Sequence, residues 1–198
     1  MKRTLALEWS SRKLSVAIGE VSKEASLDRF RAPEAMGLVD AAMAESGFSE
    51  IDEIKVGRGP GNFSGIRLAF AWASGFAAPG GVELISISSC RALVSRMLQE
   101  EPRSQGILIL GDARRGQWWG GVFRPQQSGE WEMHAPEVWL RRVRSEAESG
   151  CPLRVISPDA ERLAAAIECE ALYPHAQDLL AWTGPSEPAE PLYFHPPV

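Results

Sequence analysis

The sequence predicts an α/β fold in two halves, on the basis of three observations. Near the N-terminus lies a strand-like run at 14–18, in which apolar side chains occupy alternate positions. Strand-like and helix-like segments then alternate, which calls for a mixed sheet covered by helices. The polar segment 100–106 interrupts this pattern and contains a proline, so it predicts a boundary between domains at 1–103 and 104–198.

The first half is expected to contain three strands followed by alternating helices and strands. A turn at Ser10-Ser11-Arg12 separates the first two strands, and the third strand is weaker. Pro33 fits the first turn of a helix, and Gly47 fits its end, because these residue types favour those positions. The expected strands are 5–9, 14–18, 24–30, 51–56 and 82–87, and the expected helices are 33–46, 64–77 and 89–99.

The second half begins a new sheet after the polar segment. The turn at 112–116 joins two strands, and Trp118 and Trp119 lie on opposite faces of the second one. From Pro185 onward the tail holds five prolines and must be extended rather than helical. The expected strands are 107–110, 117–123, 131–134 and 153–156, and the expected helices are 136–148 and 159–168.

The composition of the chain disfavours several classes of protein, among them nucleic-acid-binding, metal-binding and membrane proteins. The chain has 21 basic and 26 acidic residues and a formal charge of -5, which disfavours gripping nucleic-acid phosphates without a basic partner. Three cysteines without CxxC spacing suggest no disulfide framework or zinc site, and the three histidines are too far apart for a metal site. No apolar span is long enough for a membrane helix, so we expect a protein of the reducing cytoplasm. The cysteines are Cys90, Cys151 and Cys169.

The segment 57–67 contains four glycines and a proline between an expected strand and an expected helix. Such a loop either receives an anion at the helix N-terminus or docks closely against other backbone, with Asn62 or Ser64 as the helix cap. It lacks the Gly-Lys-Ser/Thr ending of a P-loop and the spacing of a dinucleotide-binding motif. Ser64 resembles a hydrolase nucleophile, but no histidine stands in a partnering context. The residues that would contact an anion or nucleotide are Gly59, Pro60, Gly61, Ser64, Gly65 and Arg67.

The two helices beside this loop each have a second smooth or apolar side. Helical spacing directs Ile66 and Phe70 toward the sheet and puts Leu68, Trp72 and Phe76 on roughly the opposite side. Either these sides pack within the chain or they form half of a four-helix interface with a second subunit. The candidate interface residues are Met36, Gly37, Asp40, Ala41, Ala44, Leu68, Trp72 and Phe76.

Two further groups in the second half have alternative interpretations. Asp112 with Arg114 and Arg115 is either an anion site or, as we favour, a solvated turn whose charges pair with each other. The tryptophans are suited to stacking on bases, but the acidic charge of the chain favours packing. They are Trp118, Trp119, Trp131 and Trp139.

The segment 57–67 resembles the G-x-G-P-G-S-F-T-G-L-R signature of the TsaB (YeaZ) family, with Asn62 for Ser, Ser64 for Thr and Ile66 for Leu. Supporting similarities lie in the strand-turn-strand start, in the turn at 112–116 and in two other short segments. These two are 85–93 and Pro191-Leu192-Tyr193.

The resemblance implies an actin-like, Hsp70-like ATPase (RNase H-like) fold with two lobes, each built on a five-stranded mixed sheet. It also implies a non-catalytic subunit that binds and activates TsaD in forming the threonylcarbamoyl group on the tRNA adenosine next to the anticodon. TsaE would join the assembly, tRNA would be met only through the complex, and the chain alone would form homodimers through the same helices. No cofactor is expected, and ATP binding by this chain alone is doubtful. The alternative is a nucleotide-binding protein or hydrolase that uses the loop at 57–67.

One departure from the family bears on chemistry. Where the family reads Asp-Thr-Ser after the first strand, this chain has Glu8-Trp9-Ser10. We expect the bulky Trp9 to crowd the place where related ATPases hold a nucleotide phosphate and its metal. This change does not touch the candidate interface.

Overall fold

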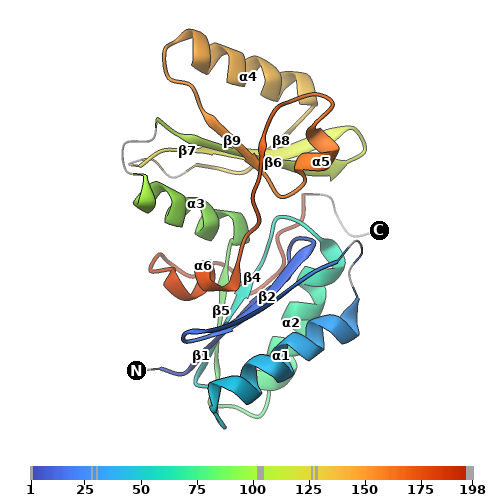
Figure 1. Ribbon diagram of the computed structural model, residues 1–198, viewed down its shortest axis with the longest axis vertical. Coiled ribbons are helices and arrows are strands. Elements are labelled where there is room, and N and C mark those ends of the chain that lie inside the picture. The colour runs from blue at the N-terminus through green and yellow to red at the C-terminus, as the bar shows by residue number, and fades with distance from the viewer. Residues whose placement is uncertain are drawn as a thin grey trace. The chain divides into compact units, whose positions relative to one another are not determined.

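The chain folds into two α/β units, each with one five-stranded mixed sheet (Figure 1). The computed structural model describes residues 2–27, 29, 31–101, 105–125, 127 and 129–194. Unit 1 comprises Met1–Leu93 together with Pro174–Val198, and unit 2 comprises Val94–Tyr173. The expected fold class, with two mixed sheets flanked by helices, is confirmed.

The sheet of unit 1 has the strand order β3-β2-β1-β4-β5. Antiparallel pairing joins β1 to β2, with Leu5 opposite Ile18, and β2 to β3. The pairs β1–β4 and β4–β5 are parallel, so β1 connects an antiparallel meander to a parallel half. The strands are β1 Thr4–Glu8, β2 Lys13–Ile18, β3 Val21–Ser26, β4 Glu53–Gly57 and β5 Glu83–Ile87.

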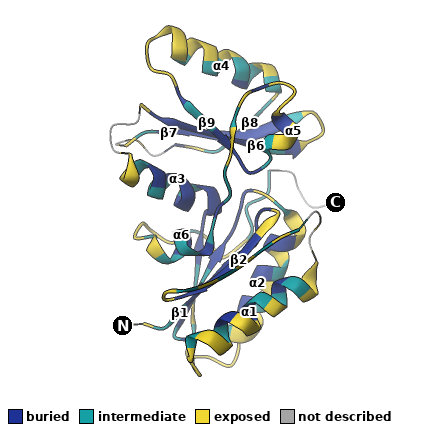
Figure 2. Ribbon diagram, in the orientation of Figure 1, coloured by how far each residue is buried: buried dark blue, intermediate teal, exposed yellow. Residues whose placement is uncertain are grey.

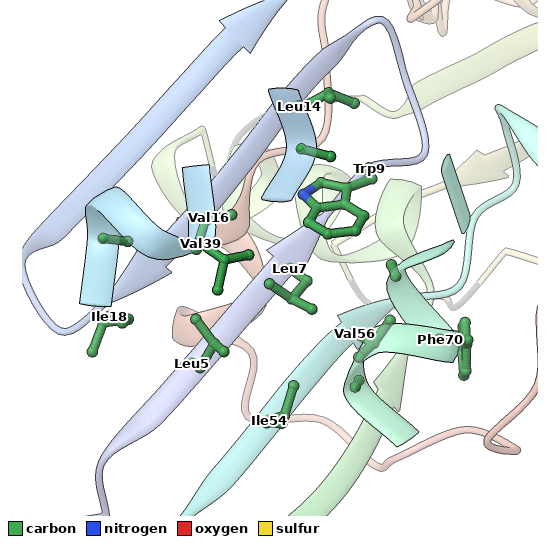
Figure 3. Packing of buried hydrophobic residues seen from close by; sticks show 14 of the residues in the cluster. Leu5, Leu7, Trp9, Leu14, Val16, Ile18, Val39, Ile54, Val56 and Phe70 are labelled. Atoms are coloured by element: carbon green, nitrogen blue, oxygen red, sulfur yellow. The ribbon is translucent and has the colours of Figure 1, made fainter. Parts of the chain in front are cut away.

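Helices cover both faces of this sheet because side chains alternate along its strands. Leu5 and Leu7 of β1 lie in a core cluster with α1 (Ala32–Ser46) and α2 (Phe63–Ala77), as Figure 3 shows. The intervening Ala6 lies in a second cluster with α6 (Ala176–Ala181) and with the beginning of α3 (Ser89–Glu100). The helix α1 ends where the sequence predicts, at Gly47 with a φ of 66°.

Unit 2 has the strand order β10-β9-β6-β7-β8. Its core centres on Trp139 of α4, which is fully buried and donates a hydrogen bond from Nε1 to the Trp118 carbonyl at 3.1 Å. Trp118 lies in this core cluster, whereas Trp119 contacts the ring of Trp131. The elements are β6 Ile107–Arg114, β7 Gln117–Phe123, β8 Glu132–His134, α4 Pro136–Glu148, β9 Arg154–Ser157, α5 Ala160–Leu163 and β10 Glu170–Ala171.

The two units meet in the sequence between Leu93 and Val94 and again between Tyr173 and Pro174. The expected boundary between residues 103 and 104 lies outside the described residues. The segment Pro174–Val198, expected in the second lobe, is grouped with unit 1. The reason is that α6 packs on the first sheet, where the Ala176 N–H donates to Ser15 Oγ at 2.9 Å.

Three elements differ most from their expected bounds, and the first is β6, which was expected at 107–110 but continues to Arg114. The third strand was expected at 24–30, but β3 begins at Val21 because a tight turn at Gly19 (φ 57°) follows β2 directly. The end of the expected strand falls partly outside the described residues. The helix expected at 159–168 is the short α5, because the chain must turn after it for Glu170 to pair with β9.

Candidate functional site

The glycine loop, residues 57–62, runs from the end of β4 to the start of α2 and packs against the turn that follows β1. A Cβ atom on Gly61 would lie closer than 3.0 Å to the carbonyl oxygen of Ser10, and Gly61 has a φ of 152°. The next residue, Asn62, donates its N–H to the same Ser10 carbonyl at 2.6 Å. A Cβ on Gly57 would collide with the side chains of Glu8 and Ser89. The glycines therefore permit close contact with other parts of the same chain.

Three N–H groups of this loop, those of Arg58, Gly59 and Asn62, donate within the chain. Arg58 donates to the carbonyl of Ile87, the last residue of β5, at 2.9 Å, and Gly59 donates to Ser89 Oγ at 3.0 Å. Asn62 Oδ1 accepts from the N–H groups of Ser64 and Gly65 at 3.1 and 3.4 Å and caps α2. The sequence left open whether Asn62 or Ser64 caps the helix, and the structure shows Asn62 as the cap. It also shows the loop docked against other backbone of the chain.

Two other candidate anion contacts, Pro60 and Arg67, lie in different surroundings. The Pro60 carbonyl lies 3.8 Å from the Cys90 sulfur, inside the protein, and its peptide bond with Gly59 is cis. The Arg67 guanidinium lies over the ring of Phe63, 5.1 Å from its centroid, and the Arg67 side chain is exposed. The structure therefore engages Arg67 with the first turn of α2 and not with the loop.

Trp9 belongs to the protein core, and its expected crowding of the place where related ATPases hold a nucleotide phosphate and its metal stays a prediction. Its side chain is fully buried in the core cluster with α1 and α2, next to Leu7 and Leu14 in Figure 3. The preceding Glu8 points to the other face of the sheet, because consecutive residues of a strand alternate. There its Oε1 accepts the N–H of Ser10 at 2.8 Å, and burial raises the pKa of the Glu8 carboxyl.

An aromatic pair marks the outer side of α2. The rings of Trp72 and Phe76 stack with centroids 5.0 Å apart and an interplanar angle of 22°. Phe76 is 38% exposed, while Leu68 and Trp72 are half-buried and pack against the core. This ridge therefore lies on a flank of α2 beside the core side, not opposite it as the sequence suggested. On the other flank, half a turn from Trp72, lies Phe63.

The outer side of α1 is smooth and exposed, as Figure 2 shows. A Cβ on Gly37 would have no atom within 4 Å, and Met36 is half-buried. Both helices cover the same face of the sheet, so the structure places the eight candidate interface residues on neighbouring helices of one face. The exposed members on α1 are Gly37, Asp40, Ala41 and Ala44.

Sequence reasoning missed the role of the extended tail beside this loop. Glu187 forms an ion pair with Arg58 at 3.1 Å, and the Leu192 N–H donates to the Arg58 carbonyl at 2.8 Å. The Tyr193 ring contacts Phe63 at a centroid distance of 4.9 Å. Only the family-like Pro191-Leu192-Tyr193 in the sequence pointed to these residues.

The charged turn of unit 2 pairs with itself, as we favoured. Arg114 Nη1 lies 3.1 Å from Asp112 Oδ2, and Arg162 approaches the same oxygen at 3.5 Å. Arg115 and Gly116 have positive φ, 54° and 75°, as the central residues of a tight hairpin turn require, and the flanking Arg114, which pairs with Gln117, also has a positive φ of 66°. In the described part of the chain, no cluster of His, Cys, Asp or Glu is arranged to hold a metal ion. Nor does any helix there have the length and hydropathy to cross a membrane.

Comparisons with known proteins agree with this architecture. A family model described as "TsaD: tRNA N6-adenosine threonylcarbamoyltransferase" matches residues 28–128, just over half of the chain. The tRNA threonylcarbamoyladenosine biosynthesis protein TsaB of Escherichia coli is 26% identical over 145 residues, which cover 70% of this chain and 62% of the relative. The TsaB protein of Haemophilus influenzae is 30% identical over 116 residues, covering 56% and 49%. The chain belongs to the TsaB (YeaZ) family.

Solved structures extend the similarity over nearly the whole chain. A Pseudomonas aeruginosa protein described as similar to peptidase YeaZ has a TM-score of 0.72 and 25% identity, and the match covers 98% of this chain and 100% of that one. The structure titled YeaZ from the same organism has the same TM-score at 24% identity and supports the fold. The matches span less than two thirds of the curated TsaB relatives' length. The segment that the TsaD family model matches contains the glycine loop, α1 and α2 of this chain.

Proposed function

We propose that this chain is a non-catalytic subunit that binds and activates TsaD in forming the threonylcarbamoyl group on the tRNA adenosine next to the anticodon. The observation that carries the proposal is the aromatic pair Trp72 and Phe76 on α2, which shares its core cluster with α1. Burying a large aromatic side chain stabilises by roughly 1.5–3 kcal/mol, so a pair that stays partly exposed favours association with a partner. Small residues on α1 let a partner helix approach closely.

The chemistry of the glycine loop supports a non-catalytic role. The N–H groups of Arg58, Gly59 and Asn62 donate within the chain and are therefore not available to a phosphate. Ser64 lies exposed at the start of α2, while His134 pairs with Glu132 and His175 caps α6. A serine nucleophile needs a histidine within hydrogen-bond reach, and neither of the two histidines among the described residues is engaged with Ser64. We therefore propose that the chain holds no nucleotide by itself.

Activation then follows from binding alone. A subunit that binds one conformation of TsaD more tightly than another shifts the population of TsaD toward that conformation. TsaE joins the assembly in this proposal, and tRNA is met only through the complex. In the absence of TsaD, the same face of α1 and α2 pairs two copies of the chain.

Light scattering after size exclusion tests the interface, with the chain alone and mixed with TsaD from the same organism. We expect a one-to-one complex for the natural chain. Trp72→Glu should weaken it at least about thirtyfold, because a charge would enter a buried aromatic contact. Ser74→Glu is the matched control, since Ser74 is exposed on the same helix but points in nearly the opposite direction from Trp72. An unchanged affinity of the Trp72→Glu variant for TsaD would contradict the proposed interface.

A titration with ATP tests the alternative of a nucleotide-binding protein or hydrolase. We expect no saturable binding to the isolated chain. Saturable binding that disappears in an Arg67→Ala variant, while the unfolding curve stays unchanged, would favour the alternative instead.

A further inference from the structure

The tail residues 187–193 run alongside the edge strand β5 and the glycine loop that leads into α2. At one end, the Glu187 N–H donates to the Ser86 carbonyl at 2.9 Å, which pairs the tail with the edge of β5. At the other end, the Leu192 N–H reaches the Arg58 carbonyl, and the Tyr193 ring contacts Phe63. The tail therefore contacts the glycine loop and the first residue of α2.

Glu187 is the charged anchor of this segment. Its Oε2 lies 3.1 Å from Nη1 of Arg58, and its Oε1 lies 3.9 Å from Nε of Arg91. The Arg58 side chain is only 8% exposed, and Arg58 belongs to the glycine loop. A buried guanidinium that loses its carboxylate is left with an uncompensated charge, so the loop and the tail are energetically coupled.

The coupling continues from the loop into α2. Asn62 both caps α2 and donates to the Ser10 carbonyl, so the position of the loop sets the position of the helix N-terminus. Phe63, the first residue of α2, is held between Tyr193 and the Arg67 guanidinium. Since Phe63 and Trp72 lie on opposite flanks of α2, the tail does not cover the partner-binding ridge.

We propose that residues 187–193 form a strap that positions the glycine loop and α2 for partner binding, with Glu187 as the positioning residue. This inference rests on the proposed function, because it assigns regulation of the same helix face to the tail. The strap acts through the loop and contributes no contact to TsaD itself. Detaching it would loosen the N-terminal end of α2 while the ridge side chains remain present.

Two independent variants detach the strap. Glu187→Gln keeps the size of the side chain but removes its charge, and Leu192→Pro removes the N–H that donates to Arg58. Glu190→Gln is the matched control, because Glu190 is an exposed acid of the same segment. Glu187→Asp keeps the charge on a shorter side chain and serves as the rescue variant.

Amide hydrogen exchange and affinity for TsaD are measured on the full chain. Glu187→Gln and Leu192→Pro should speed exchange in residues 57–65 by about tenfold, with the β2–β3 hairpin unchanged as an internal reference. Both variants should also weaken TsaD binding by about tenfold. Glu190→Gln should change neither quantity, and Glu187→Asp should recover part of both.

The readouts separate failure of the strap from failure of the proposed function. Unchanged loop exchange in both detaching variants would overturn the strap. Faster loop exchange with TsaD affinity within twofold of the natural chain would overturn the positioning role of Glu187. If the natural chain does not bind TsaD, the proposed function fails and the positioning role fails with it, whatever the exchange rates show.

Discussion

Replacing Gly61 with alanine should destabilise the chain by about 2–6 kcal/mol, because backbone strain and a steric collision fall on one position. The new Cβ would collide with the backbone carbonyl of Ser10, and a backbone atom cannot move aside as a flexible side chain can. The φ of 152° at Gly61 is one that residues with a Cβ rarely adopt. Moving the loop away would relieve the collision but would break the 2.6 Å hydrogen bond from Asn62 to Ser10.

Chemical unfolding followed by circular dichroism measures this effect as a change in the free energy of unfolding. The matched control is Gly75→Ala, the same substitution within α2, where a Cβ would have no atom within 4 Å. We expect the control to be more stable than the natural chain by about 0.5–1 kcal/mol, because glycine weakens a helix interior. If Gly61→Ala stays within about 0.5 kcal/mol of the natural chain, the docked-loop interpretation is refuted.

Three further substitutions test other parts of the structure. Hydrogen bonds from Arg3 hold the pKa of Asp52 well below its usual range, so this carboxylate's contribution is full above a pH of about 4 and is lost as pH falls toward the folded-state pKa. Asp52→Asn should therefore lower stability at neutral pH and reduce its loss on acidification, which urea unfolding at several pH values measures. Burial raises the pKa of Glu8, so stability is lost as pH rises above about 4, and Glu8→Gln should gain relative to the natural chain at pH about 7 but not at pH about 3. Trp139→Ala should cost about 3–5 kcal/mol in unfolding experiments, since it empties the core of unit 2 and leaves the Trp118 carbonyl without its partner.

Periodic segments could be predicted from the sequence because packing and local preference agree in them. The helix expected at 64–77 is observed as Phe63–Ala77, and the strand expected at 117–123 is observed with the same bounds. The helix at 136–148 is likewise observed with its predicted bounds, beginning with Pro136 at a position where proline is favoured. In these segments the apolar spacing indicates the side that faces the core, although in α2 it put Leu68 and Trp72 too far from that side.

Features that depend on distant contacts could not be predicted from local patterns. The helix α6 has only six residues, too few for a periodic signal, and the sequence analysis missed it. Strand alternation carries Trp9 into the core on the opposite face from Glu8, and the sequence analysis did not state which face it would take. In the candidate site, the exposed helix faces could be predicted from spacing, whereas the ion pair of Arg58 with Glu187 joins residues far apart in the sequence.

The discontinuity of unit 1 sets the order in which the chain can mature during its synthesis. Unit 2 is one contiguous stretch and can fold as soon as it leaves the ribosome, whereas the sheet of unit 1 must wait for α6 and the tail to cover it. Until then, the alanine-lined face around Ala6 and Ala17 stays open to water and to other chains. Contacts between residues so far apart in sequence form slowly. We therefore expect newly made chains to pass through a stage in which unit 2 is folded while the open face of unit 1 favours aggregation.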